Sequence, residues 1–454
     1  MRTIERRIFL KEGAVALLAL GFPPRFLARA LAAELPGTAC RKSVIFLFQR
    51  GAVDGLNMVV PFGEEAYYRV RRSIAVGAPR AGDESRAIDL DGFFGLHPAL
   101  SPLHDLYVRG ELAAVQAAGS PHPSRSHFDA QDFMESGTPG MKSTRDGWLN
   151  RLLAENCAGC ACAGDPSSDG AAGRTLADPT AHAADHAAGQ AKMGDGSPLR
   201  GVAVGAAEMP RSLRGAYPTL AIPDLERFGI AGGRDPSLES AFRRVYRTDS
   251  GDLLAGPAED SFAAIDVLRK TDPLRYRPRD GVEYPRTAFG AALRQIAQLI
   301  KAEVGLEVAF AELGGWDTHF AQGGAQGQLA ARLRELSSGL RALYDDLDER
   351  MEDVVIVTMS EFGRTVAENG SGGTDHGHGN CMLVLGGGVA GGRVLGKWPG
   401  LEPEQLYEGR DLAITTDFRD LFAEVVSGHL GAERLERVFP GHALDPERHP
   451  GVLR

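Results

Sequence analysis

Acidic residues and histidines gather in glycine-rich segments of this chain. Asp317 and His319 follow Gly314-Gly315, and a second such segment, 374–380, carries one aspartate and two histidines. Carboxylate oxygens and imidazole nitrogens are ligands that zinc or manganese accepts. Glycine permits the sharp turns through which neighbouring side chains converge on one ion. The pattern therefore predicts a divalent metal site, although each segment alone is equally typical of a hydrogen-bonded turn. The candidate metal ligands are Asp54, Asp317, His319, Glu361, Asp375, His376 and His378.

These segments follow or precede short apolar runs that are typical of strands buried on both faces of a parallel sheet. The runs are 44–48, 112–117, 201–204, 306–310, 354–359 and 382–385. A leucine stripe at steps of three and four predicts a helix over 329–347, and residues 289–304 form a second helical pattern. We therefore expect an α/β fold, an open and mostly parallel sheet with helices on both faces. In such sheets, ligands bind beyond the carboxyl ends of the strands, where the candidate ligands stand.

The first 32 residues have the pattern of a twin-arginine export signal. Arg6 and Arg7 stand directly before Ile8-Phe9-Leu10-Lys11, and an apolar stretch follows over 14–22. This stretch is about half of the roughly 20 residues that a membrane span needs, and small residues up to Ala32 suit cleavage. We expect residues 33–454 to form the mature domain, exported by the twin-arginine translocase to the periplasm or beyond, without a membrane span. The alternative is an ordinary N-terminal helix with two surface arginines.

Charge and composition narrow the partners and mark one insertion. The formal net charge of −10 argues against nucleic acid, which needs a basic face. Residues 157–198 are rich in Ala, Gly, Asp and Ser without apolar periodicity, so we expect a mobile insertion. Cys157, Cys160 and Cys162 open it, and their spacing suits a local disulfide or, alternatively, a metal or redox site.

Five motifs together resemble a bacterial family called domain of unknown function 1501. They are Arg50-Gly51 with Asp54-Gly55-Leu56-Asn57, Phe94-Gly95-Leu96-His97-Pro98-Ala99-Leu100, Ser124-Arg125-Ser126-His127-Phe128, Gly314-Gly315-Trp316-Asp317-Thr318-His319 and Ser360-Glu361-Phe362-Gly363-Arg364-Thr365. The family is grouped with the alkaline phosphatase and sulfatase superfamily. The resemblance therefore implies an alkaline phosphatase-like, metal-dependent hydrolase fold over nearly the whole mature chain, apart from the insertion.

The same resemblance implies roles for the candidate ligands. Asp54 takes the place of the superfamily's first metal ligand, and Asp317 with His319 takes the place of a later pair. The superfamily's Asp-His pair at the next central strand is replaced here by Glu361-Phe362. A last histidine is expected from the following loop, either His376 or His378, with Asp375 in place of the lost ligand.

The resemblance also points to a nucleophile at the start of a helix near residue 128. Pro121 stands where the sulfatase signature has its modified cysteine, so formylglycine chemistry is not expected. Ser126 or Ser124 remains, and each is equally suited to cap the helix. We favour Ser126 because it directly precedes the helix, whose N-terminus stabilises anions.

These features lead to a first hypothesis, an exported metal-dependent hydrolase of phosphate or sulfate esters acting on a small anionic substrate. Arg125 and Arg364 are expected to clamp the oxygens of the anion. The second hypothesis is a non-catalytic exported binding or assembly protein on a degenerate hydrolase scaffold, since fold does not imply function. A metal-dependent enzyme with another reaction, such as a mutase, is a third.

Overall fold

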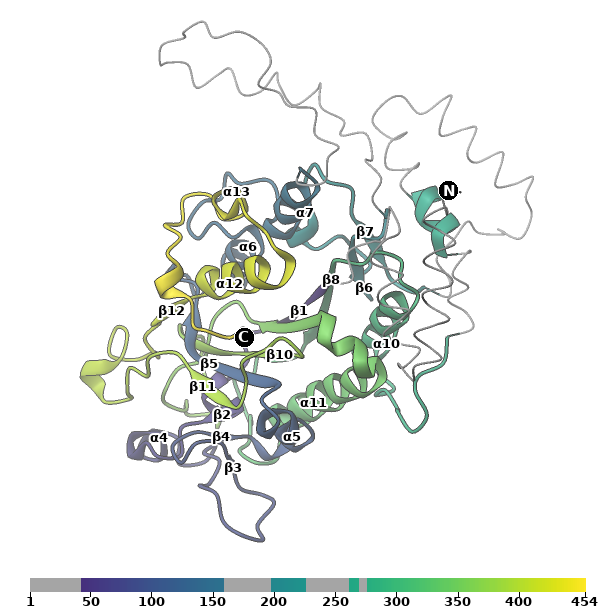
Figure 1. The fold of residues 1–454 in the computed structure, drawn as a ribbon. Coiled ribbons are helices and arrows are strands. Elements are labelled where there is room, and N and C mark those ends of the chain that lie inside the picture. Colours follow the sequence, from purple (N-terminus) through teal and green to yellow (C-terminus); the bar gives the residue numbers. More distant parts are fainter. Residues whose placement is uncertain (1–41, 159–196, 226–260, 269–275) are drawn as a thin grey trace, which may run out of the picture.

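A computed structural model describes residues 42–158, 197–225, 261–268 and 276–454 of the chain (Figure 1). The predicted export signal and almost all of the predicted insertion lie outside the described residues. The predictions about Cys160 and Cys162 lie outside them too.

A nine-stranded sheet forms the centre of the described chain, in the order β11-β5-β10-β9-β1-β8-β6-β7, with β12 paired to β5. Its strands are β1 (Ser43–Arg50), β5 (Leu112–Gly119), β6 (Gly201–Val204), β7 (Leu220–Ile222), β8 (Val308–Gly314), β9 (Val354–Met359), β10 (Asn380–Gly386), β11 (Arg393–Leu395) and β12 (Thr416–Asp417). All six runs predicted from the sequence are strands of this sheet.

The middle of the sheet is parallel. β8, β1 and β9 are neighbours that run the same way, with Phe46 of β1 opposite Phe310 of β8 and Val357 of β9. β10 is antiparallel to both of its neighbours, β9 and β5, so β5 again runs in the direction of β9. The carboxyl ends of β1, β5, β8 and β9 therefore lie at one edge, and the segment that leads into β10 lies there too.

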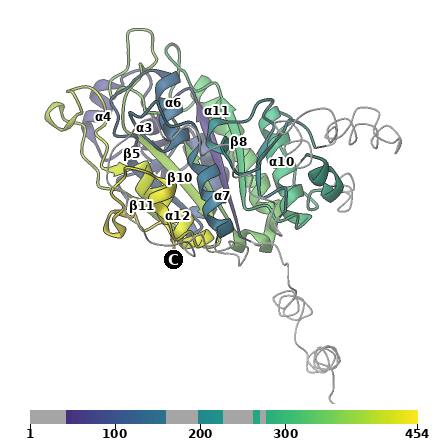
Figure 2. The same ribbon diagram turned by 90° about the horizontal axis from the view of Figure 1, so that it is seen from above.

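Helices cover both faces of the sheet (Figures 1 and 2). α10 (Ala288–Lys301) and α11 (Gln328–Leu347) pack on one face, and α7 (Trp148–Ala158) and α12 (Phe418–Leu430) pack on the other. The side chains of β1 alternate between these layers, since Ile45 and Leu47 join the first core and Phe46 and Phe48 the second. The predicted open, mostly parallel sheet with helices on both faces is confirmed.

The leucine stripe explains α11. Leu329, Leu333, Leu336, Leu340 and Leu343 are fully buried, and they form the apolar face that packs against the sheet and α10. The helix begins after Gly327 and ends at Asp348, whose positive φ of 50° breaks the helical path. α11 thus crosses between β8 and β9 and leaves both strands ending at the same edge.

Smaller elements complete the described chain. A three-stranded sheet, in the order β2-β4-β3, flanks the large one. Its strands are β2 (Val59–Val60), β3 (Ile88–Asp89) and β4 (Gly95–Leu96). The remaining α-helices are α3 (Gly55–Met58), α4 (Glu65–Val70), α5 (His104–Val108), α6 (His127–Ser136) and α13 (Leu435–Val438).

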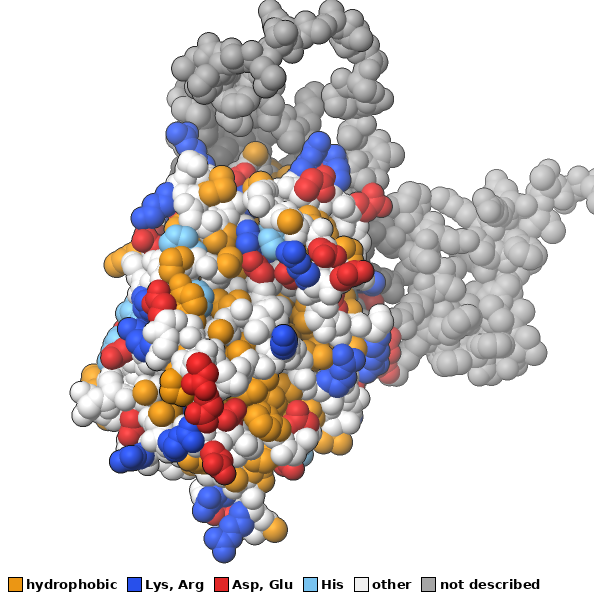
Figure 3. Space-filling model, turned by 90° about the vertical axis from the view of Figure 1, so that its left-hand side faces the viewer, with side chains coloured by type: hydrophobic (Ala, Val, Ile, Leu, Met, Phe, Trp, Pro, Cys, Tyr) orange, Lys and Arg blue, Asp and Glu red, His pale blue; other side chains and the backbone are white. Residues whose placement is uncertain are grey.

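None of the helices in the described part of the chain is both long and apolar enough to cross a membrane. Figure 3 shows one face of the molecule, on which acidic and basic side chains of the described residues interleave.

Candidate metal centre

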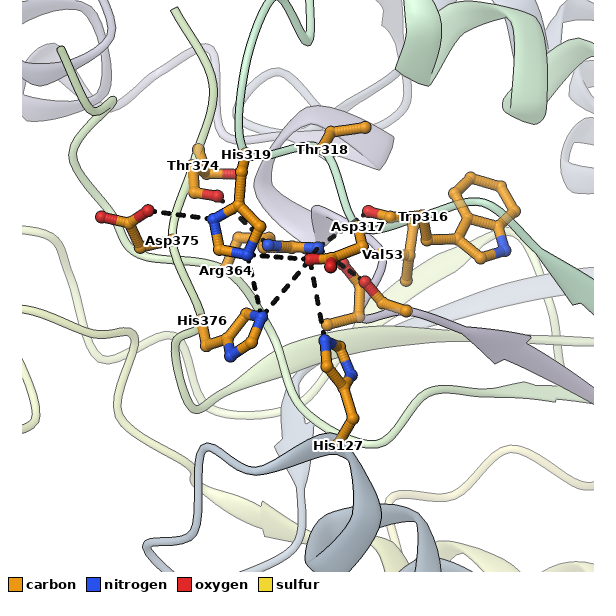
Figure 4. Close-up of polar contacts among 12 residues, drawn as sticks. Val53, His127, Trp316, Asp317, Thr318, His319, Arg364, Thr374, Asp375 and His376 are labelled. Atoms are coloured by element: carbon orange, nitrogen blue, oxygen red, sulfur yellow. Dashed lines mark hydrogen bonds and ion pairs between the residues drawn. The ribbon is translucent and has the colours of Figure 1, made fainter. Parts of the chain in front are cut away.

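Four candidate ligands meet at the edge where the parallel strands end (Figure 4). Asp317 and His319 lie on the loop that follows β8, and His376 lies on the segment that leads into β10. His127 is the first residue of α6, which follows β5. His127, Asp317 and His376 each offer one ligand atom, and these three atoms lie within 4.8 Å of one another.

The distances between ligand atoms suit a shared ion. Asp317 Oδ1 lies 3.0 Å from His319 Nε2, 3.3 Å from His376 Nε2 and 3.6 Å from His127 Nε2. The Nε2 atoms of His319 and His376 are 3.0 Å apart. Ligands at zinc–nitrogen distances of 2.0–2.1 Å on a tetrahedron would lie about 3.3 Å from one another. The spacing of these donors is thus that of a first coordination shell.

An oxygen acceptor holds the other nitrogen of each histidine. His127 Nδ1 lies 2.8 Å from Glu361 Oε1, His319 Nδ1 lies 3.0 Å from Asp375 Oδ1, and His376 Nδ1 lies 2.9 Å from the carbonyl oxygen of Arg125. A carbonyl or an ionised carboxylate only accepts, so each Nδ1 carries the proton. In the neutral rings, the three Nε2 lone pairs then face the cluster, as in metal-binding histidines with ordered outer partners.

This arrangement brings lone pairs and a negative charge together. The Nε2 atoms of His319 and His376 are both acceptors in this tautomer, and the Asp317 carboxylate stands beside them. His127 Nε2 is buried and has no hydrogen-bond partner among the described residues. Acceptors at such distances repel one another unless a cation lies between them, either protons or a metal ion. The donor set therefore fits a divalent metal such as zinc or manganese.

The titration of these groups reflects the same crowding. The hydrogen bond to Glu361 raises the pKa of His127 more than burial lowers it. Burial, helped by the nearby charge of His127, lowers the pKa of His376. Burial would raise the pKa of Asp317, but the hydrogen bond and charge of Arg364 outweigh it and lower the pKa overall. Asp317 is thus kept as a carboxylate, the form that binds a metal.

Arg364 holds Asp317 from behind. Its Nη2 lies 2.5 Å from Asp317 Oδ1, and it also donates to the carbonyl oxygens of Gly51, Ala52, Trp316 and Thr374. The guanidinium is fully buried and its donors are used inside the protein. This placement suits a residue that orients Asp317 and joins the loops, and it directs the side chain away from solvent.

Two glycines permit the loops to approach this closely. A Cβ on Gly373 would lie 2.4 Å from the carbonyl group of His319, and Gly51, at a φ of +113°, packs against the backbone of Asp317. Any side chain at either position would push apart the segments that carry the ligands. The glycine-rich composition of these segments thus has a direct geometric reason.

Two further predicted ligands act around the cluster. Glu361 follows β9, is buried, and accepts hydrogen bonds from Gln131 Nε2 and the Gly51 amide as well as from His127. Burial would raise its pKa, but these hydrogen bonds, that of His127 first, lower it. Asp375 accepts from Asn369 and His319, and these bonds lower its pKa. Both carboxylates hold histidines in place.

Asp54 and His378 lie in other surroundings. The fully buried Asp54 accepts from Arg71 Nη1 and from Gln322 Nε2, each at 2.6 Å. The ring of His378 stacks on Tyr407, with centroids 4.2 Å apart, and burial lowers its pKa to about 4. Neither residue belongs to the cluster of His127, Asp317 and His376.

The predicted catalytic residues frame the start of α6. Arg125 Nη2 pairs with Asp411 at 2.5 Å and with Glu408 at 2.7 Å. Ser126 is the N-cap residue of α6, is exposed, and makes no side-chain capping hydrogen bond. Ser124 Oγ accepts from the Ser126 amide and so orders the turn. The Ser126 side chain therefore stands next to His127 without a capping role.

His127 is the ligand candidate that sequence reasoning left out of the metal set. Its position at a helix start is equally typical of a solvent-exposed histidine. The available signal was Gln131, one turn along α6, because a second polar side chain on the same helical face indicates a buried polar partner. That partner is Glu361, which both side chains contact.

Comparison with known proteins confirms part of the family resemblance. A family model described as "Protein of unknown function (DUF1501)" matches residues 257–438, a range that contains Asp317, His319 and His376. The motifs near residues 54, 97 and 127 lie outside that range. No curated protein matches the chain.

Two solved structures are similar to the chain at low identity. One is the lipoteichoic acid synthase LtaP from Listeria monocytogenes, with 9% identity, a TM-score of 0.33, and coverage of 77% of this chain and 66% of that chain. The other is Ps i-CgsB, with 10% identity, a TM-score of 0.37, and coverage of 88% and 74%. The chain thus spans slightly less than two thirds of LtaP. These likenesses assign no activity to this chain.

Proposed function

We propose that this chain is an exported, metal-dependent hydrolase of phosphate or sulfate esters. The observation that carries the proposal is the convergence of three histidine Nε2 atoms and one Asp317 oxygen, with each Nδ1 atom held by an oxygen acceptor. Such a set of donors has few structural uses, because its members repel one another without a cation. The donor types match zinc or manganese.

His127, Asp317, His319 and His376 would hold the metal in this proposal. When bound, the ion polarises the ester oxygen and offsets charge on the leaving oxygen. Glu361, Asp375 and the carbonyl oxygen of Arg125 keep each histidine in the tautomer that presents Nε2. The nearby ring of Phe362, 5.0 Å from that of His127 and 5.1 Å from that of His376, limits water on one side.

Ser126 is the proposed nucleophile. It directly precedes His127, and its hydroxyl is exposed and free of a capping bond. The amide groups at the start of α6, a helix of 10 residues, favour negative charge there. Ser126→Ala should lower turnover by orders of magnitude and leave the bound metal unchanged. Full activity in this variant would assign attack to water instead.

Metal analysis and a substrate screen test the proposal together. Purified protein should contain a divalent ion by elemental analysis and should cleave a generic aryl phosphate or aryl sulfate, with activity lost on chelation and restored by zinc or manganese. Asp317→Ala should lose both metal and activity. Metal-free protein that never gains activity in any of these additions would contradict the proposal.

One observation favours a second candidate, a non-catalytic exported binding or assembly protein. Arg125 and Arg364, the predicted anion clamps, are both engaged by partners inside the protein. A protein of this class would bind metal without cleaving any ester. The screen separates the two, because bound metal with no turnover supports the second candidate.

Export is part of the proposal and rests on Arg6 and Arg7. Replacement of both by Lys should retain the protein in the cytoplasm, whereas the unchanged chain should appear in the periplasmic fraction with an N-terminus near Ala32 or Ala33. Unchanged export of the double variant would show that the twin-arginine reading is wrong.

A further inference from the structure

A single buried amide joins the two loops that carry most of the candidate ligands. Gln322 Oε1 accepts hydrogen bonds from Thr318 Oγ1 and Thr374 Oγ1, each at 2.8 Å. Its Nε2 donates to Asp54 Oδ2 at 2.6 Å. One side chain therefore contacts the loop after β8, the segment before β10 and the end of the β1 loop.

The two threonines stand next to the ligands. Thr318 lies between Asp317 and His319, and Thr374 comes two residues before His376 (Figure 4). A movement of either threonine would displace the ligand beside it, because adjacent residues are linked by one rigid peptide. Gln322 thus acts on the ligands through one residue on each loop.

Backbone hydrogen bonds hold the same two loops in register around Gln322. The Thr374 amide donates to the Thr318 carbonyl at 3.1 Å, and the Gln322 amide donates to the Gly372 carbonyl at 2.9 Å. Gly373, between these bonds, has no room for a Cβ against His319. The loops are therefore packed at the shortest distance that backbone permits, and Gln322 fixes their side chains relative to each other.

Burial gives these bonds a strong hold. Gln322, Thr318 and Thr374 are almost fully inaccessible to water, as is Asp54. Hydrogen bonds in such surroundings are strong, and an unpaired partner cannot turn to water. Asp54 is itself fixed by Arg71, which also donates to the carbonyl oxygens of Thr365 and Val366. The amide is thus tied to a rigid neighbour on its Nε2 side.

We propose that Gln322 is a positioning residue of the metal centre, which sets the separation between the Asp317–His319 pair and His376 and thereby the affinity for the metal. This inference rests on the proposed function, since it requires that the cluster binds a metal. Gln322 touches none of the ligand atoms, and its effect passes through Thr318 and Thr374.

Gln322→Met tests the inference with Zn²⁺ and Co²⁺ as probes. The variant keeps side-chain length but loses all three hydrogen bonds, and we expect a roughly 10-fold weaker Zn²⁺ affinity, in the range seen for lost outer partners of metal ligands. The visible absorption of bound Co²⁺ should shift, because it reports ligand geometry. The matched control is Gln116→Met, since Gln116 is equally buried but bonds the carbonyl oxygen of Val59.

Thr374 provides a second test that keeps Gln322 in place. Thr374→Val removes one hydroxyl with little change of shape, and Thr374→Ser keeps the hydroxyl. We expect weaker Zn²⁺ binding and a shifted Co²⁺ spectrum for the valine variant, and near-complete rescue for the serine variant. A purely structural role would lower the unfolding temperature without changing either metal readout.

The outcomes separate two failures. Wild-type protein that binds neither Zn²⁺ nor Co²⁺ would overturn the proposed function and this inference with it. Wild-type protein that binds both ions, with unchanged affinity and Co²⁺ spectrum in Gln322→Met and Thr374→Val, would overturn this inference alone.

Discussion

Two polar clusters adjoin beyond the ends of the central strands, and they balance charge in different ways. In the first, Asp54 pairs with Arg71, whose guanidinium also donates to Asn57 and to two backbone carbonyl oxygens. In the second, Asp317 faces three histidine nitrogens that accept, with Arg364 as its cationic donor. The first cluster contains its own cation, and the second gathers more acceptors than it has donors.

This difference separates a structural site from a ligand site. Both clusters begin with an aspartate just beyond a strand end, so residue type and position do not distinguish them. The distinguishing feature is whether the chain supplies a positive partner for each acceptor. Asp54 receives Arg71, and the histidine cluster leaves its Nε2 atoms facing one another.

The largest effect is expected from breaking the internally balanced cluster. Arg71→Met leaves the buried Asp54 carboxylate without its cation, so the free energy of unfolding should fall by about 3–5 kcal/mol. Urea unfolding of metal-free protein measures this loss. The matched control is Arg69→Met, two residues away, whose side chain is 54% exposed in its pair with Glu402. That variant should change by less than about 1 kcal/mol; equal losses would show that the Asp54 pair has no special role.

The next effect concerns the cluster that lacks a cation. Zinc or manganese at a free concentration about 100 times the dissociation constant should stabilise the wild-type protein by about 2.7 kcal/mol. His376→Ala should lose this response, because it removes a ligand. His378→Ala should keep it, since His378 stacks on Tyr407. Thermal unfolding with and without metal measures both variants, and an unchanged response in His376→Ala would refute the assignment.

The sequence predicted much of the fold because its signals are local. Each of the six strands is a continuous apolar run, and the α11 leucines repeat at helical spacing, so burial alone determines both. The antiparallel direction of β10 has no such local signal. Its run resembles those of the parallel strands, and its direction follows from the path of the 360–379 segment along one edge.

The site was predictable where ligands stand directly at strand ends. Asp317, His319 and His376 meet as the glycine-rich pattern indicated. The pairing of Asp54 with Arg71 was not predictable, because it depends on how α4 and the residues after it pack against β1. The role of His127 depends on Glu361, 234 residues away, and contacts of that separation leave no periodic signal in one sequence.

A smaller effect should follow from the outer partners of the histidines. Glu361→Gln keeps an oxygen acceptor for His127 but removes the negative charge that makes its ring a better ligand. We expect metal affinity to fall by about 10-fold to 100-fold, measured by competition with a chelator. Glu312→Gln is the control, because Glu312 pairs with Arg50 at the same sheet edge. Equal losses in the two variants would indicate a general charge effect.

The smallest effect is expected at Asp375, which holds His319 as Glu361 holds His127. The side chain of Asp375 is 57% exposed, whereas that of Glu361 is fully buried. Water screens the exposed charge and can replace its hydrogen bond to His319, so Asp375→Asn should weaken metal binding only a few-fold. The same competition assay at two salt concentrations tests this reasoning. Added salt should reduce the difference between wild type and Asp375→Asn but not that for Glu361→Gln. A loss at Asp375 as large as that at Glu361, and insensitive to salt, would show that Asp375 itself binds the metal.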